Sequence, residues 1–152
     1  MGKTLKKMWG ISEIPIYCLI FWSILSVGLL ATKLIDTTLQ SILGWVVIIS
    51  AYGYVGYYAK AKGESIGFAA KTGAFAGVIV GFIGAIIGII SYYTMPDLFA
   101  QVLADAIENG APAELTEKMM EIMVYVGLLI QPIFSAVIGA LFSALGGLIN
   151  RK

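Results

Sequence analysis

The sequence contains no histidine, a single cysteine and few charged residues, which make up 12% of its 152 residues. Without histidine, the catalytic mechanisms and zinc sites that depend on an imidazole are excluded. The lone Cys18 cannot form a disulfide within the chain. Since an average globular domain carries roughly 25% charged residues, the surface of this chain is far less charged than a water-facing surface usually is. These absences argue against most classes of soluble enzyme.

Hydrophobic residues are abundant instead, at 59% before the 18 glycines are counted. A transmembrane helix needs about 20 predominantly apolar residues. Four stretches meet this length without a charge in their interiors, at about 14–34, 39–59, 66–93 and 119–149. Pro15 falls in the first turn of the first stretch, where its missing N–H costs no hydrogen bond. We therefore predict an all-α integral membrane protein, a four-helix bundle forming one domain over residues 1–152.

The net charge is only +1, but the charges are sorted along the chain. Eight of the ten cations precede the first stretch, separate the second from the third, or follow the fourth: Lys3, Lys6, Lys7, Lys60, Lys62, Lys71, Arg151 and Lys152. Lys and Arg are retained on the cytoplasmic side during insertion. We therefore expect a multi-pass protein of the plasma (inner) membrane with cytoplasmic N- and C-termini, and an external segment at 96–118.

The external segment and its boundary carry most of the carboxylates, namely Asp97, Asp105, Glu108, Glu114, Glu117 and Glu121. Apolar residues recur between them with helical spacing, at Leu98, Phe99, Val102, Leu103, Ala106 and Ile107. Thr94 is a candidate N-cap for this helix, Asn109-Gly110 would end it, and Pro112 would allow a second helix to begin. The pattern predicts an external amphipathic helical hairpin between the third and fourth spans.

The carboxylates of this hairpin are expected to form a solvated helix face, because runs of charged residues on exposed helices usually serve only to keep that face in water. A docking surface for a partner is the alternative. A specific cation site is disfavoured, since the spacing is not that of a Ca²⁺-binding loop and Lys118 is interleaved among the acids. The sequence predicts no metal ligands and no cofactor.

Small residues recur at three- or four-residue intervals in the third and fourth spans. The positions are Gly73, Gly77, Gly81, Gly84 and Gly88 in the third span, and Gly139, Ser143 and Gly147 in the fourth. Lipid supplies no hydrophobic force between helices, so faces of small residues are where helices approach closely and pack. We predict that these residues pack the helices of the bundle together. A subunit interface is the second interpretation, and a pore or substrate groove is the third.

Gln131-Pro132 is the one polar irregularity inside a span. Pro132 has no N–H and clashes with the carbonyl of Leu128, which predicts a helix kink. Broken helices line sites in transporters near the bilayer midplane. Gln131, however, lies 18 residues from Ile149, or about 27 Å along the helix, and so toward the outer boundary. A kink with one interhelical hydrogen bond is the interpretation that we favour.

From the glycine-rich third span onward, the order of the parts follows a known pattern. The Gly/Ala-rich span is followed by Ser91-Tyr-Tyr-Thr-Met-Pro-Asp-Leu-Phe, an acidic Met-containing helix, a proline in the next span, and a final Gly-Leu-Ile-x-Arg-Lys. Over residues 66–152 the chain thus resembles the domain of unknown function 4199 family, small bacterial membrane proteins. The resemblance implies a four-span fold and carries no catalytic residues with it.

For function, we predict a non-enzymatic membrane subunit or scaffold that packs through its glycine-rich helices. Its partners would be the lipid bilayer and copies of itself or other membrane proteins, and no nucleic acid. The alternative is a component of a small-solute or ion channel or transporter, a class that usually needs charge inside the membrane. A lipid-modifying enzyme is disfavoured, because the chain lacks histidine and any evident acid–base pair.

Overall fold

The structure is a computed structural model that describes residues 2–108, 110, 112 and 117–149. Five helices follow one another along the chain: α1 (Lys3–Ala31), α2 (Thr37–Ala61), α3 (Ile66–Thr94), α4 (Pro96–Glu108) and α5 (Glu117–Ile149). Four segments are long and apolar enough to cross a membrane, namely α1, α2, α3 and the part of α5 from Glu121 onward. The structure confirms the predicted all-α bundle of a multi-pass membrane protein, whose environment is a lipid bilayer.

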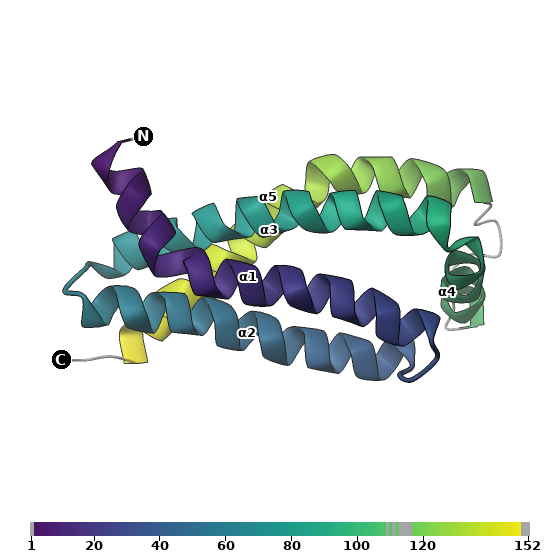
Figure 1. The fold of residues 1–152 in the computed structure, drawn as a ribbon, viewed down its shortest axis with the longest axis horizontal. Helices are drawn as coiled ribbons and strands as arrows, with labels where there is room; N and C mark the ends of the chain where they lie inside the picture. Colours follow the sequence, from purple (N-terminus) through teal and green to yellow (C-terminus); the bar gives the residue numbers. More distant parts are fainter. Residues whose placement is uncertain (1, 109, 111, 113–116, 150–152) are drawn as a thin grey trace.

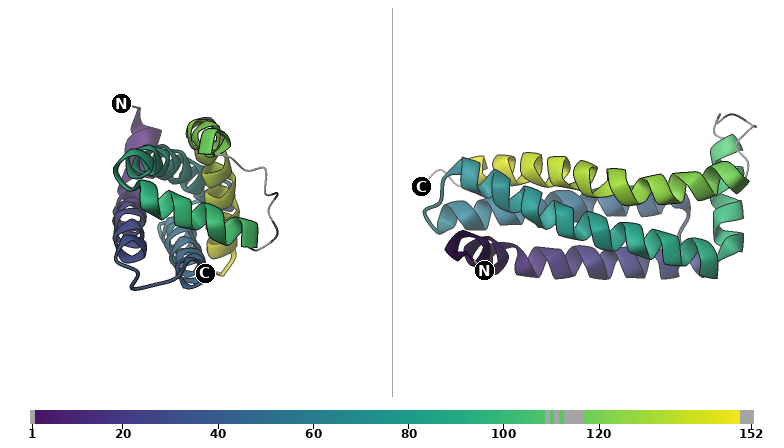
Figure 2. Two further views of the ribbon diagram at one scale, coloured as in Figure 1. Left: turned by 90° about the vertical axis from the view of Figure 1, so that its right-hand side faces the viewer. Right: turned by 90° about the horizontal axis from the view of Figure 1, so that it is seen from above.

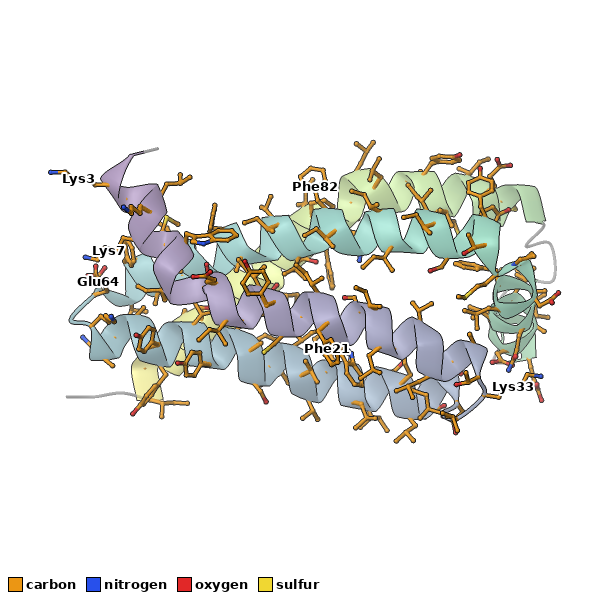
Figure 3. All side chains as sticks on the ribbon, viewed as in Figure 1. Lys3, Lys7, Phe21, Lys33, Glu64 and Phe82 are labelled. Carbon is orange, nitrogen blue, oxygen red and sulfur yellow. The ribbon has the colours of Figure 1, made fainter. Side chains whose placement is uncertain are left out.

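The four long helices run side by side, and α4 lies across one end of the bundle (Figures 1 and 2). We call this the outer end. Both ends of the described chain lie at the opposite, inner end, together with the connection between α2 and α3 (Figure 1). Lys3, Lys7 and Glu64 lie at the inner end, whereas Lys33 lies at the outer end beside α4 (Figure 3). The charges that are separated in the sequence are therefore separated along the bundle axis.

The first helix departs from expectation. It begins at Lys3 rather than near residue 14, so Pro15 lies in the helix interior and not in its first turn. Proline in a helix interior lacks the N–H that would bond the carbonyl four residues earlier, here that of Ile11, and bends the helix. The early part of α1 is accordingly turned away from the rest of the helix (Figure 1). An ion pair between Lys7 and Glu64 ties this part to the α2–α3 connection (Figure 3).

Side chains set where the next two helices begin. The Leu39 N–H donates to the Asp36 carboxylate at 2.6 Å, and the Phe68 N–H donates to the Ser65 hydroxyl at 3.1 Å. Both contacts satisfy an N–H that has no partner within its own helix. Thr94 was expected to cap α4 in the same way, and this expectation is wrong. Its hydroxyl donates to the Ile90 carbonyl at 2.8 Å, so Thr94 is the last residue of α3.

Helix α4 corresponds to the amphipathic helix predicted to end before Asn109-Gly110. The hairpin and its external position stay predictions. Its apolar residues are partly shielded by the end of the bundle, whereas Asp97, Gln101 and Glu108 are exposed. The chain between α4 and α5 includes residues 109, 111 and 113–116, which lie outside the described residues, and Glu114 is among them. From Glu117 the backbone runs as one helix into the fourth span.

Few large side chains are buried, and the core consists mainly of small and medium residues such as Ala59, Ala69 and Ala76. Large apolar residues point outward instead, with Leu129 72% exposed. This arrangement suits a protein whose outer surface is solvated by lipid chains, because lipid does not drive large side chains inward. Helix α5 packs along α3 and, toward the inner end, also against α2. Contact between these helices therefore depends on small residues.

Candidate functional site: the helix interfaces and the outer cavities

Glycines of α3 place its backbone directly against that of α5. A Cβ atom added to Gly77 would lie 2.7 Å from the Ala136 Cα, and one added to Gly81 would lie 2.9 Å from the Gln131 carbonyl oxygen. A Cβ on Gly73 would overlap the Gly139 carbonyl and the Ser143 side chain. Real Cβ atoms essentially never lie this close to other atoms, so only glycine fits these three positions.

A second interface of the same kind joins α2 to α5. A Cβ on Gly56 would overlap the Ser143 carbonyl and would lie 2.8 Å from the Gly147 nitrogen. Ser143 is fully buried, and its hydroxyl donates to the Tyr52 carbonyl at 2.9 Å. Gly53 also belongs to this interface, because a Cβ on Gly146 would lie 2.8 Å from the Gly53 carbonyl carbon. Neither Gly53 nor Gly56 was predicted, since their three-residue spacing does not match the four-residue pattern of small residues that is typical of packed membrane helices. Helix α5 is thus held between α2 and α3 at its inner half.

The outer two glycines of α3 differ from the inner three. A Cβ on Gly84 would meet only the Gln131 side chain, with its Nε2 atom at 2.8 Å. A Cβ on Gly88 would meet nothing within 4 Å. Five glycines that the sequence groups as one packing face are therefore divided. Three contact the α5 backbone, Gly84 faces the Gln131 side chain, and Gly88 faces open space toward the outer end.

This space consists of two adjoining cavities, of about 260 and 360 Å³, between the α1–α2 pair and the α3–α5 pair. We call it the outer cleft. The two cavities share six lining residues: Trp22, Ser23, Trp45, Ile48, Gly84 and Gln131. The smaller cavity reaches Tyr52 and Ile138 in the middle of the bundle, and the larger one reaches Gln40 near the outer start of α2.

Gln131 and Pro132 lie where the α3–α5 interface ends and the outer cleft begins. Helix α5 is continuous through Pro132, which is buried against Gly81. The interhelical hydrogen bond expected for Gln131 is not formed, since its side-chain amide has no hydrogen-bond partner within the part of the chain that the structure describes. Ser23, by contrast, donates to the Leu19 carbonyl of its own helix at 2.9 Å. An amide with unused donors and an unused acceptor therefore lines a cleft inside the span region.

A third cavity, of about 620 Å³, lies at the corner between α4 and the outer ends of α3 and α5. We call it the aromatic pocket and define it by its aromatic and acidic lining residues: Tyr92, Tyr93, Asp97, Phe99 and Glu121. The Tyr93 hydroxyl lies 2.6 Å from that of Tyr125 and donates to the Glu121 carboxylate at 3.4 Å. Helices α3, α4 and α5 thus all contribute residues to one site.

The predicted acidic surface is divided by this arrangement. Asp97 and Glu121 line the aromatic pocket, whereas Asp105 lines a separate cavity beside Lys33 and Asp36. Glu108 is exposed at the end of α4. Glu114 lies outside the described residues, and the side chain of Glu117 is also outside them. Among the described residues, no three Cys, Asp or Glu side chains are placed to hold a metal ion.

Comparison with known proteins gives one match. The family model described as protein of unknown function (DUF4199) matches residues 15–152. The comparisons with curated proteins and with solved structures find no match. The family match reaches from the first span to the end of the chain, so it also covers the front half, where the sequence analysis found only two generic spans. On this evidence, the chain belongs to the DUF4199 family.

Proposed function

We propose that this chain is a non-enzymatic membrane subunit against which a transmembrane helix of a partner packs at the outer cleft. The partner is either another copy of the chain or a member of a larger membrane complex. The proposal refines the idea of assembly through glycine-rich helices, because Gly73, Gly77 and Gly81 are already occupied by contacts within the chain. Only Gly84 and Gly88 of that group leave a backbone surface that a second helix could approach.

The observation that carries the proposal is the unpaired amide of Gln131 beside these two glycines. A polar group without a hydrogen-bond partner is costly in an apolar medium. Hydrogen bonds between membrane helices contribute roughly 0.6 kcal/mol on average and up to about 2 kcal/mol. A partner helix at Gly84 and Gly88 would bring its backbone or a polar side chain to Gln131. Close approach and a hydrogen bond would then stabilise the same contact.

A channel or transporter component is the second candidate, and the outer cleft is the feature that favours it. Two observations weigh against this reading. The central parts of the four spans contain no charged residue, whereas transport pathways commonly use intramembrane charge. The smaller cavity of the cleft is bounded in mid-bundle by Tyr52 and Ile138, and inward of it α5 packs tightly against α2 at Gly56. A site for assembly explains the cleft without requiring a transport pathway through the bundle.

Assembly is expected to depend on Gln131 and Gly88. In mild detergent, the full chain should purify as a complex larger than one copy, measured by native mass spectrometry. Gln131→Leu removes the hydrogen bond and Gly88→Leu blocks the approach of a helix, so each should shift most of the protein to the single-chain mass. Gly28→Leu is the matched control, because a Cβ on Gly28 also meets nothing within 4 Å but lies outside the cleft.

Two results would contradict the assembly proposal. One is a wild-type chain that is a single copy with no associated protein. The other is a complex whose mass is unchanged by both Gln131→Leu and Gly88→Leu. Loss of the complex in Gly28→Leu as well would indicate a general effect of bulk on the spans rather than a site.

We also propose that the inner end is cytoplasmic, because it holds most of the cations. In a Cys18→Ala background, Glu108→Cys on α4 should react with a membrane-impermeant maleimide in intact cells. Lys62→Cys at the α2–α3 connection should react only after the membrane is permeabilised. Both side chains are exposed, so the membrane alone should decide their labelling. The reverse pattern would overturn this orientation.

A further inference from the structure

We propose that the aromatic pocket binds an alkylammonium group, as found in small organic cations and in the headgroups of choline and ethanolamine lipids. This site is separate from the outer cleft and shares none of its lining residues. Its volume of about 620 Å³ lies within the range typical of small-molecule sites, roughly 300–1,000 Å³.

Aromatic side chains form one side of the pocket. The Tyr92 ring lies 5.2 Å from the Tyr93 ring at 82°, and 5.2 Å from the Phe99 ring at 81°, between centroids. Rings at right angles present faces in different directions around a shared corner. The face of an aromatic ring carries negative potential and attracts a cation within about 6 Å, with quaternary ammonium groups as the best-known ligands.

The acidic side of the pocket supplies negative charge. Asp97 comes from the first turn of α4, and Glu121 comes from the first turns of α5. Among the side chains that the structure describes, none that lines the pocket is Lys or Arg. Among the described residues, neither carboxylate forms an ion pair. The two acids therefore make the pocket attractive to a positive charge.

A pair of tyrosines positions one of these acids. The Tyr125 hydroxyl can donate to the Tyr93 hydroxyl at 2.6 Å, which leaves the Tyr93 proton to be donated to the Glu121 carboxylate at 3.4 Å. Tyr93 and Tyr125 come from α3 and α5, and both hydroxyls lie at the outer end of these helices. This contact places the Glu121 carboxylate beside Tyr93 at the edge of the pocket.

The chemistry of the pocket selects an organic cation over a metal ion. Ca²⁺ takes six to eight oxygen ligands and Mg²⁺ demands six in a near-ideal octahedron. Two carboxylates beside aromatic faces do not provide such a set. An alkylammonium group is larger than a metal ion and gains from ring faces as well as from carboxylates, and in choline the charge lies under a surface of methyl groups. Tyrosines also collect at the headgroup level of membranes, where such groups are plentiful.

Binding of choline to the purified full chain tests the proposal. By calorimetry in a maltoside detergent, choline should bind, and its neutral isostere with carbon in place of nitrogen should bind at least about tenfold more weakly. Glu121→Gln and Asp97→Asn should each weaken choline binding by ~3- to 10-fold, which corresponds to about 0.65–1.4 kcal/mol. Phe99→Leu should weaken it, and Phe99→Tyr should retain it.

Glu108→Gln is the matched control, because Glu108 is an exposed carboxylate of α4 outside the pocket. It should leave choline binding unchanged. Equal binding of choline and its neutral isostere would overturn the proposal. So would a loss in Glu108→Gln as large as that in Glu121→Gln, since the effect would then be one of general surface charge.

Nanodiscs of different composition distinguish the two sources of the ammonium group. In discs of phosphatidylglycerol alone, free choline should bind as in detergent. If lipid headgroups are the natural occupant, discs that contain phosphatidylcholine should suppress the binding of free choline. If soluble cations are the occupant, both discs should give the same affinity. Absence of choline binding in detergent and in phosphatidylglycerol discs would overturn the proposal in both forms.

Discussion

Replacing Gly77 by leucine is expected to lower the free energy of unfolding by about 3 kcal/mol, the upper part of the usual range for overpacking. The first atom of the new side chain would already lie 2.7 Å from the Ala136 Cα. This neighbour is backbone, so no side-chain rotation can relieve the clash, and α3 must move away from α5. Reversible unfolding in mixed micelles, followed by tryptophan fluorescence, measures the effect.

Gly127→Leu is the control for this prediction. Gly127 lies on α5, and a Cβ added to it meets nothing within 4 Å. The substitution adds the same bulk and the same hydrophobicity to a span without pressing on another helix. Its stability should therefore stay within about 0.5 kcal/mol of wild type, the usual range for surface substitutions. Equal losses in both variants would show that Gly77 is not in close contact with α5.

Replacing Ser143 by leucine is expected to have an effect of similar size, because it acts on two interfaces at once. Ser143 is fully buried where α5 meets α2 and α3, and Gly56 and Gly73 both lie against it. A leucine there must displace the backbone of α2 or α3. We expect a loss of about 3 kcal/mol or more in the same unfolding measurement.

Ser143→Ala separates the size of this side chain from its hydrogen bond. It removes the donor to the Tyr52 carbonyl but leaves the packing unchanged. Hydrogen bonds between membrane helices contribute about 0.6 kcal/mol on average, so the loss should be a small fraction of that in Ser143→Leu. If the alanine variant lost as much stability as the leucine variant, the hydrogen bond rather than close packing would hold the junction.

The sequence predicted the composition of the bundle better than its contacts. Apolar runs of about 20 residues are a strong signal, and they located the four spans. The amphipathic spacing of residues 98–107 located α4. The start of α1 was missed because residues 3–13 are too polar to count as part of a span, although they are helical. A threshold on hydrophobicity finds the membrane-crossing part of a helix and not the helix itself.

The sites illustrate a second limit. Spacing alone could not divide the glycines of α3 into those against α5 and those beside the outer cleft, because both sets repeat every fourth residue. Nor could it separate Asp97 and Glu121 from Asp105, since their grouping depends on how α4 lies across the bundle. The tyrosines before Met95 were noted only as part of a family pattern, yet they form a wall of the aromatic pocket.

The position of α5 between α2 and α3 also bears on the order in which the protein is made. Chains are synthesised from the N-terminus, so α1, α2 and α3 enter the membrane before the helix that joins them. Until α5 has been synthesised and inserted, Gly56, Gly73 and Gly77 have no α5 backbone to pack against. A chain interrupted after Glu108 would retain three of its four spans but none of these contacts. Completion of the last helix is therefore the step at which the separate spans become one bundle.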